Sequence, residues 1–131
     1  MNQRRNKVNN KIGEMAWLDL TVVNATEVKD FYQKVVGWQA EDVAMGDHND
    51  YVMNSPETLE AVSGICHAKG ENADMPAAWL PYFLVKNLHE SIAHVTQLGG
   101  ELVTEIKQAG NDKYAVVKDP AGAVCSLYQK G

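Results

Sequence analysis

One pattern occurs twice in this chain, and it limits the possible folds more than any other feature. An alternating segment at residues 16–22 precedes Asn24-Ala-Thr-Glu27, and 63 residues later Asn87-Leu-His-Glu90 follows a second strand-like segment at residues 80–85. The N-x-x-E motif predicts a helix start in which Asn accepts from first-turn amides and Glu reaches back. Two such copies indicate a duplicated supersecondary unit.

The first copy predicts one strand, one helix and three more strands. Residues 16–22 place Leu and Val on one face and Trp17, Asp19 and Thr21 on the other, as expected for a strand with one face in the core. Apolar residues recur at helical spacing over residues 28–36, and Gly37 ends the helix. We expect the three further strands at residues 38–45, 51–54 and 62–67.

The second copy repeats this order. After the strand at residues 80–85, an apolar stripe over residues 88–98 predicts a helix that Gly99-Gly100 ends. Three strands are expected at residues 101–106, 113–118 and 124–128, the last two joined by a tight turn at Asp119-Pro-Ala-Gly122. We predict a flexible polar tail at 1–12 and a single domain at 13–131, with halves 14–67 and 79–129 joined by a linker at 68–78.

Composition excludes several classes of function. A net charge of −5 and a pI near 5.3 argue against a nucleic-acid partner or an anionic membrane surface. No apolar run approaches the roughly 20 residues of a membrane span. The basic N-terminus, residues 1–11, lacks the apolar core of a signal peptide, so we interpret it as a frayed cytoplasmic start, with a nucleic-acid arm as the alternative.

Cysteine usage agrees with a reducing, cytoplasmic compartment. Cys66 and Cys125 lie far apart in apolar runs, and no C-x-x-C motif is present. Two free thiols are therefore expected rather than a disulfide, a redox pair or a structural zinc site.

The order, spacing and duplication of these motifs resemble one known superfamily. Phe31-Tyr32-x-x-Val35-x-Gly37-Trp38 and Asp119-Pro120-x-Gly122 are similar to motifs of the vicinal oxygen chelate superfamily, and the resemblance covers residues 14–129. That group includes glyoxalases, bleomycin- and fosfomycin-resistance proteins, extradiol dioxygenases and methylmalonyl-CoA epimerases. The resemblance implies an α+β fold of two βαβββ modules, with an eight-stranded curved sheet around a pocket, and a homodimer.

The metal site of that superfamily does not carry over to this chain. Metal-using members take one ligand from the first strand and one from the last strand of each half, and the resemblance places three of these positions at Trp17, Leu80 and Ser126. The fourth falls within residues 64–67, where His67 or, less well, Cys66 could bind a metal. Because His and carboxylate ligands are missing elsewhere, we expect no metal or other cofactor at the usual site.

Several of these residues are candidates for binding a small molecule instead. Trp17 and Trp79 are interpreted either as core filling or as a stacking surface for a planar ligand. Asp19 is either a solvated carboxylate or a base or cation-binding group. The remaining pocket candidates are Thr21, His67, Leu80, Tyr82 and Ser126, with a structural role equally open for Tyr82 and favoured for His67.

Two functions of different classes remain open. The first is a metal-independent protein that binds a small hydrophobic or aromatic molecule, which the loss of ligands at the usual positions favours. The second is a glyoxalase-like lyase, isomerase or dioxygenase that uses Asp19 as a base or has a displaced metal.

Overall fold

The computed structural model describes residues 10–131, so most of the predicted tail at 1–12 lies outside the described residues. The described chain divides into two compact units. Unit 1 comprises residues 17–79, and unit 2 comprises residues 10–16 and 80–131. Each unit is a sheet covered by one helix and is described below by itself.

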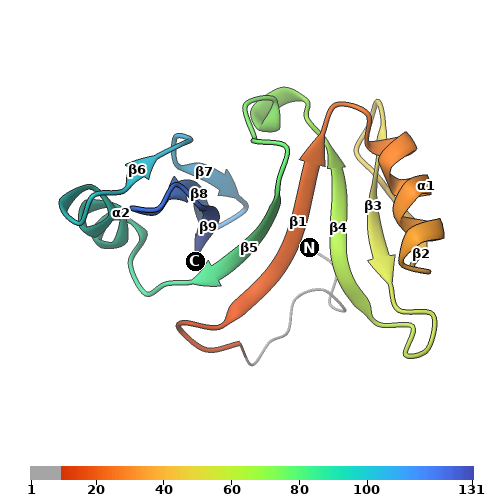
Figure 1. Cartoon of the computed structure of the whole chain (residues 1–131), viewed down its shortest axis with the longest axis horizontal. Coiled ribbons are helices and arrows are strands. Elements are labelled where there is room, and N and C mark those ends of the chain that lie inside the picture. The colour runs from red at the N-terminus through yellow and green to blue at the C-terminus, as the bar shows by residue number, and fades with distance from the viewer. Residues whose placement is uncertain (1–9) are drawn as a thin grey trace. The chain divides into compact units, whose positions relative to one another are not determined.

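Unit 1 follows the predicted βαβββ order. Its elements are β1 (Met15–Val22), α1 (Ala25–Val35), β2 (Gln39–Ala44), β3 (Asn49–Asn54) and β4 (Ala61–His67). In space the strands run β2-β3-β4-β1, with β4 parallel to β1 and the other pairs antiparallel. Figure 1 shows α1, in orange, beside the sheet made by these strands.

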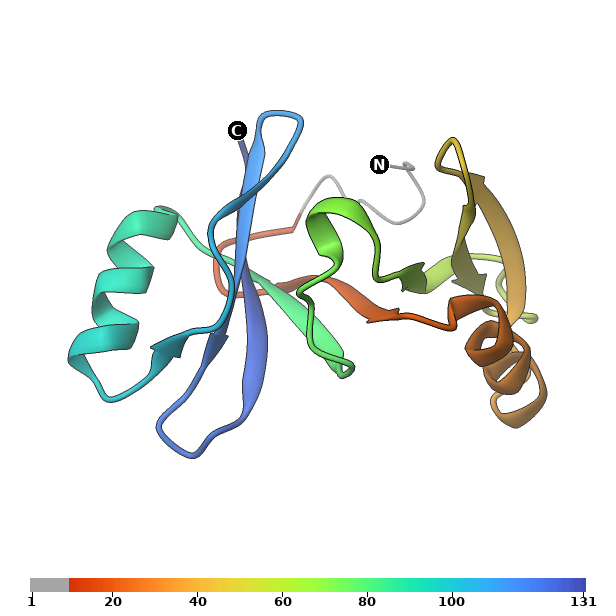
Figure 2. The same cartoon turned by 90° about the horizontal axis from the view of Figure 1, so that it is seen from above.

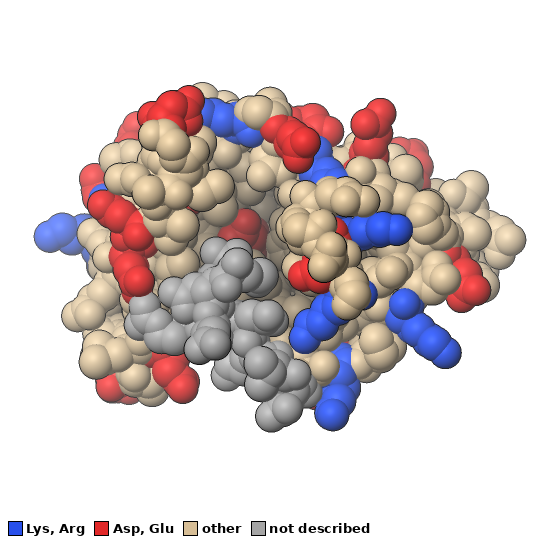
Figure 3. All heavy atoms as spheres, turned by 180° about the vertical axis from the view of Figure 1, so that it is seen from behind, with Lys and Arg blue, Asp and Glu red and all other residues tan. Residues whose placement is uncertain are grey.

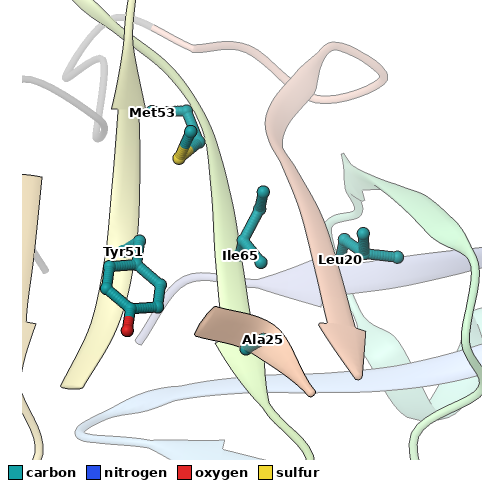
Figure 4. Packing of buried hydrophobic residues seen from close by; sticks show 5 residues of the cluster. All are labelled: Leu20, Ala25, Tyr51, Met53 and Ile65. Carbon is teal, nitrogen blue, oxygen red and sulfur yellow. The ribbon is translucent and has the colours of Figure 1, made fainter. Parts of the chain in front are cut away.

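The core of unit 1 lies under α1. The even-numbered face of β1 contributes Leu20, which packs with side chains of the neighbouring strands and with the first residue of the helix. Because side chains alternate along a strand, Trp17, Asp19 and Thr21 occupy the opposite face of β1. Figure 4 shows the five central residues of this core: Leu20, Ala25, Tyr51, Met53 and Ile65.

Unit 2 repeats the order with one additional strand. It contains β5 (Trp79–Leu84), α2 (Leu88–Gln97), β6 (Glu101–Leu102), β7 (Lys107–Ala109), β8 (Asp112–Lys118) and β9 (Val124–Gln129). The strands are ordered β5-β9-β8-β6, β7 also pairs with β8, and β5 is parallel to β9. Figure 2 shows α2, in teal, with the blue strands β8 and β9 of the same unit. The linker between β4 and β5 holds a short 3-10 helix, Gly70–Asn72.

The predicted fold class is confirmed: the protein is α+β, with a strand–helix–strands module in each half. The predicted count of eight strands is wrong, because the described residues hold nine. Of the expected strand at 101–106 only Glu101–Leu102 is a strand, and the additional strand Lys107–Ala109 follows after a break that contains the buried Thr104. The Thr104 hydroxyl accepts a hydrogen bond from the Val116 amide (3.1 Å) and donates one to the Glu105 carbonyl (3.0 Å), so it replaces regular ladder pairing there.

The two predicted helix caps differ. The Asn87 side chain accepts a hydrogen bond from the Glu90 amide at 3.0 Å, as predicted. The Asn24 side chain makes no such bond to the backbone; its amide instead donates to the Glu27 carboxylate at 3.4 Å. Asn24 has φ −104° and ψ 54°, and Asn87 has the extended φ −142° and ψ 110° that suits an N-cap side chain. The predicted capping box at Asn24 is therefore wrong.

Within residues 10–131, no helix is long and apolar enough to cross a membrane. On the face shown in Figure 3, acidic and basic side chains are interspersed among the described residues. Charge is nevertheless unequal between the units, because residues 17–79 carry 11 acidic and three basic side chains. Unit 1 is therefore the acidic part of the described chain.

Candidate functional site

A fixed carboxylate lies on the face of β1 that points away from α1. The Trp17 indole Nε1 donates a hydrogen bond to Asp19 Oδ1 at 2.9 Å, and the Cys66 thiol donates to Asp19 Oδ2 at 3.5 Å. Trp17 is 8% exposed, and Asp19 is half-buried. Asp19 therefore presents an oriented hydrogen-bond acceptor on a sheet face with an aromatic side chain beside it.

Gly64 makes room for this carboxylate. Asp19 and Gly64 are register partners in the parallel β1–β4 pair. A Cβ at position 64 would lie 2.1 Å from Asp19 Oδ1 and 3.2 Å from Trp17 Nε1. The glycine thus allows both side chains to lie flat against the neighbouring strand.

Thr21 extends the same face, but His67 belongs elsewhere. Thr21 is 4% exposed and pairs with Cys66, next to Asp19 along β1. His67 pairs with Val22, five residues beyond Trp17. At about 3.3 Å per residue this places His67 roughly 16 Å along the strand from the Trp17 position. His67 therefore does not complete a site around Trp17.

His67 instead lies beside two residues that were not among the predicted site residues, His48 and Asp50. The Asp50 carboxylate Oδ1 lies 3.4 Å from His67 Nδ1 and 3.4 Å from His48 Nε2. The rings of His48 and His67 are in edge contact, 5.1 Å between centroids. Ligand atoms of all three residues lie within 4.8 Å of one another. A signal was present: in an antiparallel β3–β4 hairpin, the start of β3 at Asp50 and the turn before it at His48 must lie near the end of β4 at His67.

The side of β1 that carries Trp17, Asp19 and Thr21 is called the Asp19 face below. Trp79 does not lie on it. Its indole Nε1 donates to the Tyr32 hydroxyl at 2.9 Å, and its ring contacts those of Tyr32 and Trp38 at 5.2 and 5.8 Å. This aromatic group packs against the core that contains Leu20, whose side chain is on the α1 side of β1. Within unit 1, Trp17 and Trp79 therefore occupy opposite faces of the sheet.

The other predicted site residues belong to unit 2. Leu80 is 1% exposed, and Tyr82 is the register partner of Ser126 across β5 and β9. The ring of Tyr82 packs against those of Tyr114 and Tyr128, with centroids 5.9 and 6.3 Å away. Ser126 is fully buried, and its hydroxyl donates to the Ala115 carbonyl at 3.2 Å. The structure thus brings Tyr82 and Ser126 together as neighbouring core residues.

The residues at the usual metal positions do not fit a metal ion. The Trp17 nitrogen carries a proton that is already donated to Asp19, and an indole N–H has no lone pair for a metal. Leu80 offers no donor atom, and the Ser126 hydroxyl is directed at a backbone carbonyl. These three positions therefore supply no ligand of the His or carboxylate type that such ions need.

Unit 2 also contains an apolar pocket of about 300 Å³ between α2 and β8. None of the eight predicted site residues lines it. Its wall includes Ser91, His94, Val95, Leu98, Val117 and Pro120.

Both cysteines are free, as expected. Burial raises the pKa of the Cys125 thiol above its ordinary value, and the nearby Asp119 charge adds to that rise. Cys125 is therefore protonated at neutral pH and a poor nucleophile.

Known proteins share this chain's sequence pattern and fold. The sequence model of the Glyoxalase/Bleomycin resistance protein/Dioxygenase superfamily matches residues 14–126. "Anthracycline biosynthesis protein DnrV" of Streptomyces peucetius is 28% identical over 131 residues, which cover 91% of this chain and 48% of that protein. The chain spans about half the length of the curated relatives it matches.

Two solved structures show the fold. A glyoxalase/bleomycin resistance protein/dioxygenase superfamily member from Vibrio splendidus is 13% identical, with a TM-score of 0.55 over 87% of this chain and 97% of that one. Methylmalonyl-CoA epimerase from Mycobacterium tuberculosis is 12% identical, with a TM-score of 0.52 over 99% of this chain and 96% of the other. At such low sequence identity, the similarity to these two structures shows a shared fold and nothing about function.

Proposed function

Because the chain belongs to the glyoxalase/bleomycin resistance protein/dioxygenase superfamily, we propose that it acts within that group as a metal-independent binder of a small hydrophobic or aromatic molecule. The observation that carries this proposal is the Trp17–Asp19–Gly64 arrangement. It places a largely buried aromatic ring beside a half-buried carboxylate that accepts a hydrogen bond from the indole N–H. A planar molecule with a hydrogen-bond donor or a positive charge fits such a surface.

The chemistry of the usual metal positions supports a role without a metal there. Trp17 provides an aromatic ring and Leu80 an aliphatic side chain. The Ser126 hydroxyl already donates a hydrogen bond to a backbone carbonyl. These groups favour contact with an organic molecule over coordination of a cation.

Ligand binding is tested by a thermal-shift screen followed by calorimetry of the compounds that stabilise the protein. The name of the S. peucetius relative refers to anthracycline biosynthesis, so an anthracycline is included among small aromatic compounds. Stabilisation should be reduced in Trp17→Phe, which keeps a ring but removes the N–H, and in Asp19→Asn, which removes the charge.

The matched control is Trp79→Phe, which changes a tryptophan that packs against the α1 core and is hydrogen-bonded to Tyr32. This variant should bind the same compounds with unchanged affinity. Equal affinity in Trp17→Phe, Asp19→Asn and the parent protein would remove the Asp19 face from consideration as the binding surface.

A second candidate function is a lyase, isomerase or dioxygenase activity of the superfamily with a displaced metal. It is favoured by one observation, the proximity of His48, Asp50 and His67, since two imidazoles and a carboxylate are a common ligand set for divalent metals in enzymes. Its test is activity that a chelator removes and that His67→Gln lacks, measured on glyoxalase and dioxygenase substrates. Activity that survives the chelator would leave Asp19 as the base to examine.

We also propose that the protein is a cytoplasmic homodimer. Apolar side chains at the end of α1 support self-association, because Phe31 is 55% exposed, Val35 62% and Val36 49%. The two free cysteines support a reducing compartment. Light scattering during size-exclusion chromatography should give twice the chain mass for the parent protein and the single chain mass for Val35→Glu.

A further inference from the structure

We propose that His48, Asp50 and His67 form a binding site for one divalent transition-metal ion of the zinc or cobalt type. The site lies in unit 1, where the turn before β3 meets the end of β4. It shares no residue with the Asp19 face or with the Trp17, Leu80 and Ser126 positions. It therefore stands independently of the proposed binding of an organic ligand.

The distances favour a metal site over a simple hydrogen-bonded cluster. Asp50 Oδ1 lies 3.4 Å from both His48 Nε2 and His67 Nδ1, which is long for an N–H···O bond, whose usual length is about 2.9–3.0 Å. Tetrahedral zinc with ligand bonds of about 2.1 Å requires ligand atoms roughly 3.4 Å apart. The two separations from Asp50 Oδ1 match the edge of such a tetrahedron, and the two imidazole nitrogens lie within 4.8 Å of each other.

The backbone fixes two of the three ligands in place. The His67 amide donates to Asp50 Oδ1 at 2.9 Å, so the carboxylate is anchored at the end of β4 beside the imidazole. The turn that carries His48 closes with a hydrogen bond from the Met45 amide to the His48 carbonyl at 2.8 Å. Gly46 in this turn has φ +98°, a conformation that glycine adopts without strain.

Asp47 orients the His48 ring. Its carboxylate Oδ1 lies 2.6 Å from His48 Nδ1, so the two side chains are hydrogen-bonded. With Nδ1 bonded to Asp47, Nε2 is the ring nitrogen that faces Asp50. Carboxylate–histidine pairs of this kind orient the metal ligands in many zinc sites.

The cluster is sheltered but open to an incoming ion. The side chains of His48, Asp50 and His67 are 16%, 13% and 13% exposed. Three protein ligands leave a fourth tetrahedral position for water, which is the arrangement of zinc sites that act on substrates. The acidic balance of residues 17–79 adds a favourable field for a cation.

The test is a Co²⁺ titration of tag-free, chelator-treated protein, followed by visible absorption. We expect one equivalent of Co²⁺ per chain, with the strong ligand-field bands of four-coordinate cobalt. His48→Gln and His67→Gln should lose the stoichiometric signal. Asp47→Asn, which keeps all three ligands, should weaken binding about tenfold, the lower end of the effect of removing such an orienting partner.

His89→Gln is the matched control, because His89 is an exposed histidine on α2. It should bind Co²⁺ as the parent protein does. Asp50→Asn gives a third ligand variant with little change in volume, and far-UV circular dichroism of each variant checks that it is folded.

Three outcomes would overturn the proposal. They are substoichiometric binding by the parent protein, binding that His67→Gln and Asp50→Asn leave unchanged, and a strong thiolate charge-transfer band, which would place the ion at a cysteine. None of these outcomes affects the thermal-shift test of Trp17 and Asp19, so failure of the metal site is distinguishable from failure of the proposed ligand binding.

Discussion

Asp19 and Gly64 are register partners on adjacent parallel strands, and the carboxylate of Asp19 occupies the space that a side chain at position 64 would fill. The Trp17 indole and the Cys66 thiol hold the two carboxylate oxygens in that space. Trp17, Gly64 and Cys66 thus contribute to the orientation of Asp19, and each can be changed separately.

Gly64→Ala should displace the Asp19 carboxylate and destabilise the protein by about 1–3 kcal/mol, the range for overpacking a filled site. In an Asp19→Ala background the same change should cost less, since the oxygen 2.1 Å from the new Cβ is gone. Urea denaturation of the four proteins gives the coupling free energy between the two positions. Equal costs in both backgrounds would show that the carboxylate is not what limits residue 64.

Trp79→Phe removes the hydrogen bond from the indole to the Tyr32 hydroxyl and should lower the free energy of unfolding by about 0.5–1.5 kcal/mol beyond the lost packing. The bond can be isolated by a double-mutant cycle with Tyr32→Phe, measured by thermal or chemical unfolding. A coupling energy near zero would mean that the two groups gain nothing from each other in the folded state.

Thr104→Val should destabilise unit 2 by about 1–3 kcal/mol, because the Val116 amide would lose the hydroxyl that accepts its proton inside the protein. Thr104→Ser is the control, since it keeps the hydroxyl and removes one methyl group. Amide hydrogen exchange at Val116 should accelerate in the valine variant. If the serine variant lost as much stability as the valine variant, the effect would come from packing and not from the hydrogen bond.

Cys125 should react with an alkylating reagent at a higher pH than a cysteine in an unstructured peptide, because burial raises the pKa of its thiol. Since the folded state keeps its proton to higher pH than the unfolded state, the free energy of unfolding falls as pH rises above the ordinary thiol pKa of about 8.5.

The alkylation rate is measured as a function of pH in a Cys66→Ser background, where Cys125 is the remaining thiol. A rate profile that coincides with that of the peptide would contradict the burial of the Cys125 sulfur.

The alternating and helical patterns predicted the fold class and most element positions. Local periodicity reports which face of an element is buried, and this information is present in each segment separately. The division at Thr104 was not predictable in this way, because it depends on a hydroxyl that pairs with Val116, 12 residues away in the chain. The cap at Asn24 failed for a similar reason: the motif is present, but the backbone there has other dihedral angles.

The site was predicted unevenly. Alternation placed Trp17, Asp19 and Thr21 on one face of β1, but it gave no information about Gly64, whose role appears only in the register of β1 against β4. The residue type of Trp79 did not reveal its surroundings, since its ring packs with Tyr32 and Trp38. His48 and Asp50 lie in and just after a turn, and their proximity to His67 follows from strand pairing.

Trp79 has a practical consequence for dividing the molecule. It belongs to unit 1, while the next residue, Leu80, belongs to unit 2, so the boundary between the units falls inside β5 and outside the irregular residues 68–78. A fragment that stops in that irregular segment loses the aromatic ring that packs against Tyr32 and Trp38. Any attempt to express unit 1 alone, or to cut and permute the chain, must therefore retain residue 79 on the first piece.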